Sequence, residues 1–280
     1  MNLMNAFRIS MEANLHFRAA PIFLFFLSVL AVDHSLEAVS ASSSRFIIHS
    51  PGSGTVKVPV VLYYETLCPY CANFIVNGLS KVFDNGLTSI IDLKLVPYGN
   101  AKIGANDTIS CQHGPSECLL NTIEACVIDA WPTVSDHFPL IYCIEKMVHT
   151  HEFTQWESCF SELGLDSKPV YDCYTSGRGT KLELQYAAET NALQPPHQYV
   201  PWVVVNGKPL YEDYENFESY ICEAYSGTSA PKACSELSHD AIKSTISVKK
   251  HQVCYKDNSA FISRMREAAA SVMRWINVVG

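Results

Sequence analysis

The stretch VKVPVVLYYETLCPYC, residues 56–71, joins an apolar segment to two cysteines at the start of a helical pattern. Val56 to Tyr64 is rich in β-branched and aromatic residues, which predicts a buried strand. Cys68 and Cys71 follow at a spacing that permits a small disulfide ring, and the unpaired amides of a helix start favour a thiolate at Cys68. We therefore expect a reversible disulfide at an accessible surface, with Cys68 as the attacking sulfur and Cys71 as the resolving one.

The chain after the cysteines continues the alternation of strand and helix. Ile75, Leu79 and Val82 recur at helical spacing until Asn85-Gly86 supplies a stop, and residues 91–95 then alternate in the strand period. The further expected elements are a cysteine-rich helical insertion over about 111–174, a helix over 179–191, a hairpin of 200–205 and 208–211 turning at Asn206-Gly207, and a closing helix over 214–224.

This order of elements resembles the thioredoxin fold, an α/β fold, carrying a cysteine-rich helical insertion. In that fold a cis proline leads into the first hairpin strand and faces the dithiol on the substrate side. Pro201 occupies the matching place, and the proline ring makes a cis bond accessible at a cost of only about 1 kcal/mol. The alternative from base rates is an ordinary trans proline that starts an edge strand.

The N-terminus has the pattern of a secretory signal. Arg8 and Arg18 precede an apolar run over 21–32 that is short for a membrane span, and small residues follow near Ala38, which favours cleavage between Ala38 and Ser43 over an uncleaved anchor. The expected divisions are a cleaved signal peptide and n-region over 1–41, a thioredoxin-like domain over 56–225, and a C-terminal tail over 226–280 that is helical or processed.

Composition narrows the function classes. The net charge is −8, with 20 basic and 28 acidic residues and no concentrated Lys/Arg stretch, so nucleic-acid binding is not expected. Eleven cysteines fit an oxidising compartment. Setting Cys68 and Cys71 aside leaves an odd number, so at least one further cysteine should be free or available for a disulfide-linked dimer.

A sequon occurs at Asn106-Asp107-Thr108, in a segment that reads as a loop. We predict glycosylation at Asn106, against the alternative of an unmodified polar loop that matches by chance.

A second motif identifies a family. Residues 111–126 read CQHGPSECLLNTIEAC and match the pattern CQHGxxECxxNxxxxC, the signature of the gamma-interferon-inducible lysosomal thiol reductase family. The matching residues are Cys111, Gln112, His113, Gly114, Glu117, Cys118, Asn121 and Cys126. The resemblance extends over roughly residues 56–234.

The resemblance implies a thiol reductase of the secretory and endolysosomal route, found in the lysosome, the vacuole or outside the cell, with its redox cysteines at Cys68 and Cys71. Its implied partners are disulfide-containing protein substrates and a small thiol reductant. No cofactor is implied besides the cysteine pair, and no stable membrane insertion follows signal cleavage. Pro69-Tyr70 differs from the mammalian members, so their potential and pH optimum do not carry over.

The signature residues leave their roles open. We expect Cys111, Cys118 and Cys126 to staple the insertion, and Gln112, His113 and Asn121 to hold its loop through hydrogen bonds. Alternatively, His113 assists proton transfer near the dithiol. A zinc site formed by Cys68, Cys71, Cys111 and His113 is disfavoured because the second pair has poor ligand spacing, so no metal is expected.

Two other function classes use the same residues. A disulfide oxidase or isomerase would have a less reducing Cys68–Cys71 pair. A secreted, disulfide-stapled binding protein would hold the pair as an inert bridge. The family resemblance favours the reductase over both.

Overall fold

The computed structural model describes residues 57–240 and 252–256. Its central sheet has four strands in the order β2-β1-β6-β7. These are β1 (Val58–Tyr64), β2 (Ile91–Pro97), β6 (Trp202–Val205) and β7 (Lys208–Pro209). β1 pairs in parallel with β2 and antiparallel with β6, and β6 pairs antiparallel with β7. This strand order and orientation confirm the thioredoxin-like expectation.

Helices supply the connections of the sheet. The dithiol segment leads through α1 (Pro69–Phe74), a π-helical turn η1 (Ile75–Leu79) and α2 (Lys81–Asp84). The insertion and the returning helix are α3 (Pro115–Ala130), α4 (Val134–His149), α5 (Ser158–Leu163), α6 (Lys168–Thr175) and α7 (Arg178–Asn191). The C-terminal helices are α8 (Phe217–Ala224), preceded by the 3₁₀ segment η5 (Tyr211–Asn216), and α9 (Lys232–Asp240).

Short strands and turns complete the described elements. They are the 3₁₀ turns η2 (Leu87–Ser89), η3 (Ala105–Asp107) and η4 (Phe153–Gln155), the paired strands β3 (Lys102–Ile103) and β4 (Ile109–Ser110), and the paired strands β5 (Tyr199–Val200) and β8 (Cys254–Tyr255).

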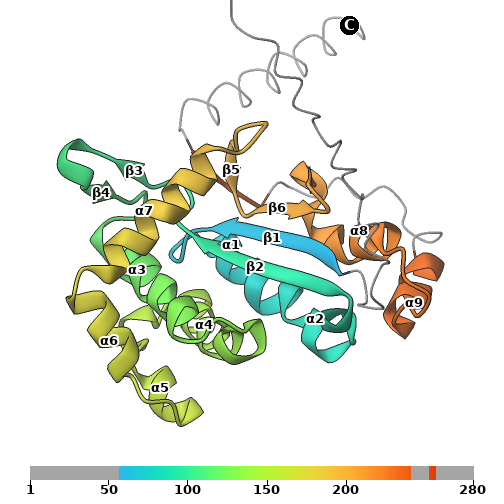
Figure 1. The fold of residues 1–280 in the computed structure, drawn as a ribbon, viewed down its shortest axis with the longest axis horizontal. Coiled ribbons are helices and arrows are strands. Elements are labelled where there is room, and N and C mark those ends of the chain that lie inside the picture. Colours follow the sequence, from blue (N-terminus) through green and yellow to red (C-terminus); the bar gives the residue numbers. More distant parts are fainter. Residues whose placement is uncertain (1–56, 241–251, 257–280) are drawn as a thin grey trace, which may run out of the picture. The chain divides into compact units, whose positions relative to one another are not determined.

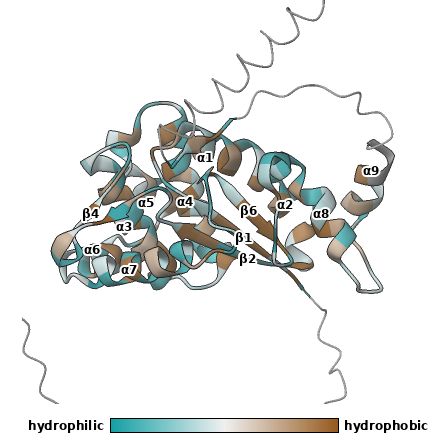
Figure 2. Ribbon diagram, turned by 90° about the horizontal axis from the view of Figure 1, so that it is seen from above, coloured by the Kyte–Doolittle hydropathy of each residue, from teal (hydrophilic) through white to brown (hydrophobic). Residues whose placement is uncertain are grey.

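The core lies where the helices cover the sheet. α3 and α7 contact β2, whereas α8 contacts β1 and β6 (Figure 1). β1 and β2 carry hydrophobic residues (Figure 2), which in β2 alternate with the exposed Asp92 and Lys94, and Val60, Leu62 and Leu95 are almost fully buried. Because the apolar strands are covered by helices, the end of β1, where the two cysteines begin, is fixed within the packed interior.

Local sequence signals explain the turns. Gly86 adopts a left-handed conformation with φ 83°, which ends the helical segment at the predicted place. Asn206 and Gly207 both have positive φ, as a type I′ turn requires, and they join β6 to β7. The hairpin and the helix stop are therefore confirmed.

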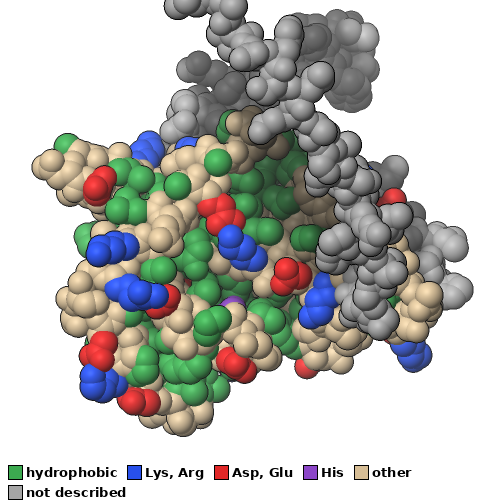
Figure 3. Space-filling model, in the orientation of Figure 1, with side chains coloured by type: hydrophobic (Ala, Val, Ile, Leu, Met, Phe, Trp, Pro, Cys, Tyr) green, Lys and Arg blue, Asp and Glu red, His purple; other side chains and the backbone are tan. Residues whose placement is uncertain are grey.

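Disulfides fasten the helical layer. Within the insertion they join Cys111 to Cys118, Cys126 to Cys173 and Cys143 to Cys159, and a fourth joins Cys222 to Cys234 at α8 and α9. The expectation that the signature cysteines staple the insertion is confirmed. The described part of the face in Figure 3 shows Lys and Arg side chains interspersed with Asp and Glu, without a concentrated basic cluster.

Some expectations concern residues that are not described. The signal peptide over 1–41 and residues 241–251 and 257–280 of the expected C-terminal tail lie outside the described residues. Among residues 57–240 and 252–256, no helix has the length and hydrophobicity needed to cross a membrane. Of the expected C-terminal tail, the described parts are α9 and the segment 252–256.

Candidate redox site

Cys68 lies where the sheet meets the first helix. It is the N-cap of α1, Pro69 occupies the first helical turn, and Cys71 follows in the same turn. This is the expected placement at a helix start, and it comes about because β1 ends at Tyr64 and only three residues separate Tyr64 from the N-cap Cys68.

The pairing of Cys68 differs from the expectation. Cys68 is bonded to Cys254, 186 residues away, and Cys71 alone among the eleven cysteines, all of which lie in described residues, carries a free thiol. The expected Cys68–Cys71 ring is therefore wrong for this structure. We also expected at least one further cysteine to be free or intermolecular. The cysteine left over is Cys254, and it instead forms an intramolecular bond with Cys68.

The expected accessibility of the pair is also wrong in this state. Cys68 and Cys71 both have 0% relative exposure. The segment 252–256 lies beside Cys68, because its strand β8 pairs antiparallel with β5 and its Cys254 is bonded to Cys68. Without a partner from this segment, β5 would present an unpaired strand edge beside the sulfur.

Pro201 stands opposite Cys68, as the fold resemblance implied. The Val200–Pro201 peptide bond is cis, and the carbonyl oxygen of Val200 lies 3.9 Å from Cys68 Sγ. The structure also has a second cis bond, Gln194–Pro195, in the segment before β5. The strand edge at Tyr199–Val200 is thus placed directly beside the reactive sulfur.

Glu65 is a buried acid beside the cysteines that the sequence analysis did not single out. Its carboxylate accepts a hydrogen bond from the backbone N–H of Asn100 at 2.7 Å, and one carboxylate oxygen lies within 4.8 Å of the sulfurs of both Cys68 and Cys254. Burial, reinforced by the nearby Glu117 carboxylate, raises the pKa of Glu65 well above its usual range. Glu65 is therefore a proton-holding group at the site.

The environment of Cys71 favours the protonated thiol. Burial, followed by the charge of Glu65, raises the pKa of the Cys71 thiol well above its usual value. Cys71 can attack as a thiolate only when a nearby group accepts its proton.

His113 links Glu65 to the protein surface. Its Nδ1 lies 2.5 Å from Glu117 Oε2 and 3.6 Å from Glu65 Oε1, and its side chain is 33% exposed. The hydrogen bond to Glu117 raises the pKa of His113. The three side chains form a continuous polar cluster from solvent to the neighbourhood of Cys68.

Other signature residues hold backbone around the site. The Asn121 side chain accepts a hydrogen bond from the N–H of Thr66 at 3.0 Å, and Gln112 donates to the carbonyl of Tyr255 at 2.8 Å. Gly114 is the N-cap of α3 with φ 92°, a conformation that favours glycine. Gln112 and Asn121 thus form hydrogen bonds, as expected, but their partners here lie outside the insertion, in the segment before Cys68 and in the tail.

Three residues at this site were not singled out by the sequence analysis: Glu65, Asn100 and Cys254. Glu65 lies three positions before Cys68 at the end of an apolar strand, where an acid is unusual, and this was an available signal. Asn100 donates through its side chain to the carbonyl of Cys254 at 3.0 Å and to Gln112 at 2.8 Å. Nothing local in the sequence distinguishes Asn100 or Cys254.

The metal alternative can be tested on the donor set. Cys68 and Cys111 are both in disulfides, so neither offers the thiolate that zinc requires. Glu65, His113 and Glu117 have ligand atoms within 4.8 Å of one another, but His113 and Glu117 are already hydrogen-bonded to each other. The zinc site considered from the sequence is therefore inconsistent with this disulfide pairing.

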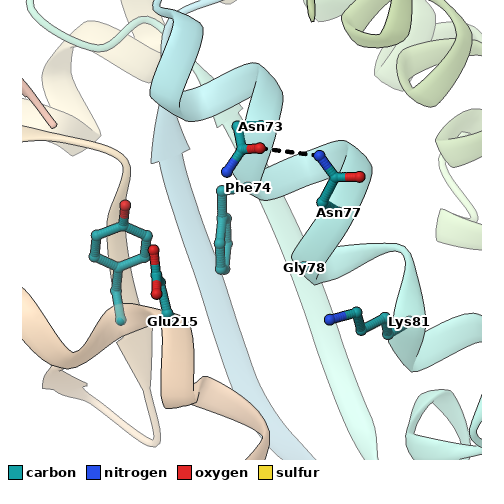
Figure 4. Close-up of a pocket in the computed structure, with 7 residues that line it drawn as sticks. Asn73, Phe74, Asn77, Gly78, Lys81 and Glu215 are labelled. Atoms are coloured by element: carbon teal, nitrogen blue, oxygen red, sulfur yellow. Dashed lines mark hydrogen bonds between the residues drawn. The ribbon is translucent and has the colours of Figure 1, made fainter. Parts of the chain in front are cut away.

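Two surface pockets border the first helix. One, of 270 Å³, is lined by Pro69 and Tyr70 of the dithiol motif, by Asn73, Val148, His149 and His151, and by Gln252 of the tail. A second lies between the helix around Asn73–Lys81 and η5 (Figure 4), and neither Cys68 nor Cys71 lines it. The first pocket adjoins the reactive segment and offers space beside it.

The sequon at Asn106 lies in an exposed turn between β3 and β4. Asn106 has φ 56° and is exposed to solvent. The position is accessible to a glycosylating enzyme, and the modification stays a prediction.

Comparison with known proteins places this site in a family. The family model described as gamma interferon inducible lysosomal thiol reductase matches residues 59–163, which include the dithiol and the signature. The gamma-interferon-responsive lysosomal thiol protein of Arabidopsis thaliana is 46% identical over 64% of this chain and 76% of its own length. The gamma-interferon-inducible lysosomal thiol reductase of Mus musculus is 37% identical over 71% and 77%.

A comparison of structures finds lower similarity. The crystal structure of reduced DsbA from Mycobacterium tuberculosis aligns with a TM-score of 0.47 and 17% identity, covering 69% of this chain and 93% of that one. The fold assignment rests on the strand order and the position of Pro201 rather than on this alignment. With the sequence relatives and the signature taken together, the chain belongs to the gamma interferon inducible lysosomal thiol reductase family.

Proposed function

We propose that this protein is a thiol-disulfide oxidoreductase that reduces protein disulfides through Cys68 and Cys71. The observation that carries the proposal is the state of Cys68. Its sulfur is bonded to a cysteine in an extended peptide strand, and that strand pairs with β5 beside the cis bond at Pro201. This is the arrangement that a mixed disulfide with a protein substrate requires.

The reaction divides into two exchanges. The Cys68 thiolate attacks one sulfur of a substrate disulfide, forms a mixed disulfide and releases the other substrate sulfur as a thiolate. Cys71 then attacks Cys68 Sγ, so that the Cys68–Cys71 disulfide forms and the second substrate sulfur leaves. The substrate gains two electrons, and a small thiol reductant restores the dithiol.

The second exchange needs a proton acceptor. Because the pKa of Cys71 is raised by burial and by Glu65, the thiol must transfer its proton as it attacks. Because burial keeps Glu65 protonated in acid, its carboxyl group, within 4.8 Å of Cys68 Sγ, can give its proton to the departing substrate sulfur, and the carboxylate that results takes up the proton of Cys71. His113 provides the exchange of that proton with solvent.

The compartment that we propose is acidic, in the lysosome or vacuole, with secretion as the alternative. The relatives are named lysosomal. Several buried carboxyl groups support the proposal, because burial raises the pKa of Glu124, Glu145 and Glu183 and keeps them neutral in acid. A protein with such groups is most stable where they remain protonated.

Insulin reduction by the purified protein across pH tests the function. We expect turnover by the wild type, loss of turnover in Cys68→Ser, and accumulation of a substrate adduct on Cys68 in Cys71→Ser. The double variant Cys222→Ser/Cys234→Ser, which removes a disulfide that does not contact the site, is the control for general damage. Full activity of Cys68→Ser would reject the proposal.

A second measurement separates the reductase from the alternatives. The redox equilibrium of the Cys68–Cys71 pair against glutathione should lie on the reducing side, whereas an oxidase or isomerase would hold a less reducing pair. An inert structural bridge would resist alkylation after mild reduction.

A further inference from the structure

We propose that Cys254 is a third redox cysteine, and that its bond to Cys68 makes residues 252–256 an internal substrate that blocks the site until a thiol opens the bond. The proposal rests on the proposed reductase function. It assigns a role to a cysteine outside both the CxxC motif and the family signature.

The docking of this segment is that of a bound peptide. Strand β8 pairs antiparallel with β5, with Val200 opposite Cys254 and Tyr199 opposite Tyr255. Further hydrogen bonds run from Lys256 N to Gln198 O at 2.9 Å, from Asn100 Nδ2 to Cys254 O at 3.0 Å, from Gln112 Nε2 to Tyr255 O at 2.8 Å and from Tyr214 Oη to Gln252 O at 2.6 Å.

These hydrogen bonds all reach backbone atoms of the segment. They therefore do not depend on the side chains at 252–256, and an unrelated extended peptide around a disulfide could form the same bonds. The segment adds two side-chain contacts of its own, since Val253 is buried and the ring of Tyr255 packs edge-on against Tyr199 with centroids 5.7 Å apart. A protein substrate and the segment 252–256 would therefore compete for the same surface beside β5.

The cysteine pairing leaves Cys254 no other role. The eight cysteines outside Cys68, Cys71 and Cys254 form four disulfides among themselves. Within one chain, Cys254 can therefore bond only to the redox pair or remain a thiol. Val200, which lies opposite Cys254 in the strand pair, directly precedes Pro201. This places the Cys254 sulfur where a substrate sulfur is expected.

Two balanced reactions open the bond. Cys71 can attack Cys68 Sγ, which forms Cys68–Cys71 and releases Cys254 as a thiol that takes up the proton lost by Cys71, with no net change of oxidation state. Alternatively, a dithiol such as dithiothreitol reduces the Cys68–Cys254 bond, is itself oxidised to its disulfide, and leaves three thiols on the protein. The second reaction prepares the enzyme for turnover.

Tethering makes the tail a strong competitor. A segment that belongs to the same chain as its site acts at an effective concentration of roughly millimolar, about a hundredfold above an insulin concentration of about 10 μM. We therefore expect oxidised wild-type protein to begin insulin reduction at least about tenfold more slowly than a variant without the Cys254 sulfur.

Disulfide mapping tests the bond directly. Full-length oxidised protein is denatured, its free thiol is alkylated, and trypsin is added. Cleavage after Lys57 and Lys81 gives a peptide with Cys68 and Cys71, and cleavage after Lys250 and Lys256 gives one with Cys254. We expect these two peptides to be cross-linked with Cys71 alkylated. In Cys254→Ser, the first peptide should carry an internal disulfide.

Kinetics test the blocking. At limiting dithiothreitol, the wild type should show a longer lag in insulin reduction than Cys254→Ser, because the Cys68–Cys71 disulfide of the oxidised variant is not covered by a bonded tail segment. After preincubation with dithiothreitol both proteins should start at similar rates, which shows that the variant is folded. The control Cys222→Ser/Cys234→Ser should keep the lag.

The outcomes separate the two proposals. A Cys68–Cys71 disulfide with a free Cys254 thiol in the wild type, or equal time courses without preincubation, would overturn the internal-substrate role and leave the reductase function standing. If neither protein reduced insulin after preincubation, the reductase function would fail, and the internal-substrate role would fail with it.

Discussion

Replacing Glu183 by Gln should remove part of the pH dependence of the folding free energy. Glu183 lies on α7, is 2% exposed, and accepts a hydrogen bond from the Thr122 hydroxyl at 2.7 Å. Its second carboxylate oxygen has no hydrogen-bond partner among the described residues. Burial raises the pKa of Glu183 from 4.5 to about 7.

The sign and size of the effect follow from proton linkage. The folded state holds the Glu183 proton up to about pH 7, whereas the unfolded chain loses it above pH 4.5. The unfolded state therefore binds fewer protons between these values, and stability falls as pH rises. The shift from 4.5 to about 7 corresponds to about 3 kcal/mol lost between pH 4 and pH 8.

Urea unfolding at several pH values, with all disulfides kept oxidised, measures this effect. The free energy of unfolding of Glu183→Gln should fall less steeply than that of the wild type, and the two curves should diverge by about 3 kcal/mol from pH 4 to pH 8. The buried amide of the variant is expected to change its free energy of unfolding by the same amount at every pH. This change does not affect the slope of the free energy against pH.

An exposed glutamate provides the control for this prediction. Glu223→Gln on α8 should run parallel to the wild type, because Glu223 is exposed. If Glu183→Gln also ran parallel, then Glu183 would be charged in the folded state at neutral pH, and the argument from its burial would be refuted.

Three further predictions concern the site and its surroundings. His113→Gln should change the pH dependence of insulin reduction on its acidic side if His113 relays the Glu65 proton, and an unchanged rate-pH profile would leave it a structural role only. Gly99→Ala should lower the free energy of unfolding by roughly 2 kcal/mol or more in urea, since Gly99 has φ 60° and an added Cβ would lie 2.6 Å from the Glu65 side chain; a neutral result would contradict that geometry. Asn106→Gln should abolish a mass shift on glycosidase treatment of secreted protein, and the absence of any shift in the wild type would remove the sequon from consideration.

Local sequence signals determined much of the fold. The apolar strand before Cys68, the stop at Gly86 and the Asn206-Gly207 turn each depend on residues adjacent in the chain, because period and turn chemistry are local properties. The CQHGxxECxxNxxxxC signature likewise identified the family, and the relatives confirm it.

Only the tertiary structure decided how the redox site is occupied. The CxxC spacing favours a ring between neighbours, yet Cys68 pairs with Cys254 because the fold brings their Cα atoms to 6.2 Å across 186 residues. The proton-holding character of Glu65 likewise arises from burial, which no single segment encodes. The sequence by itself therefore predicted which sulfur reacts, and the packing of distant segments decided which sulfur it meets, since contact and solvent exclusion exist only after the chain has folded.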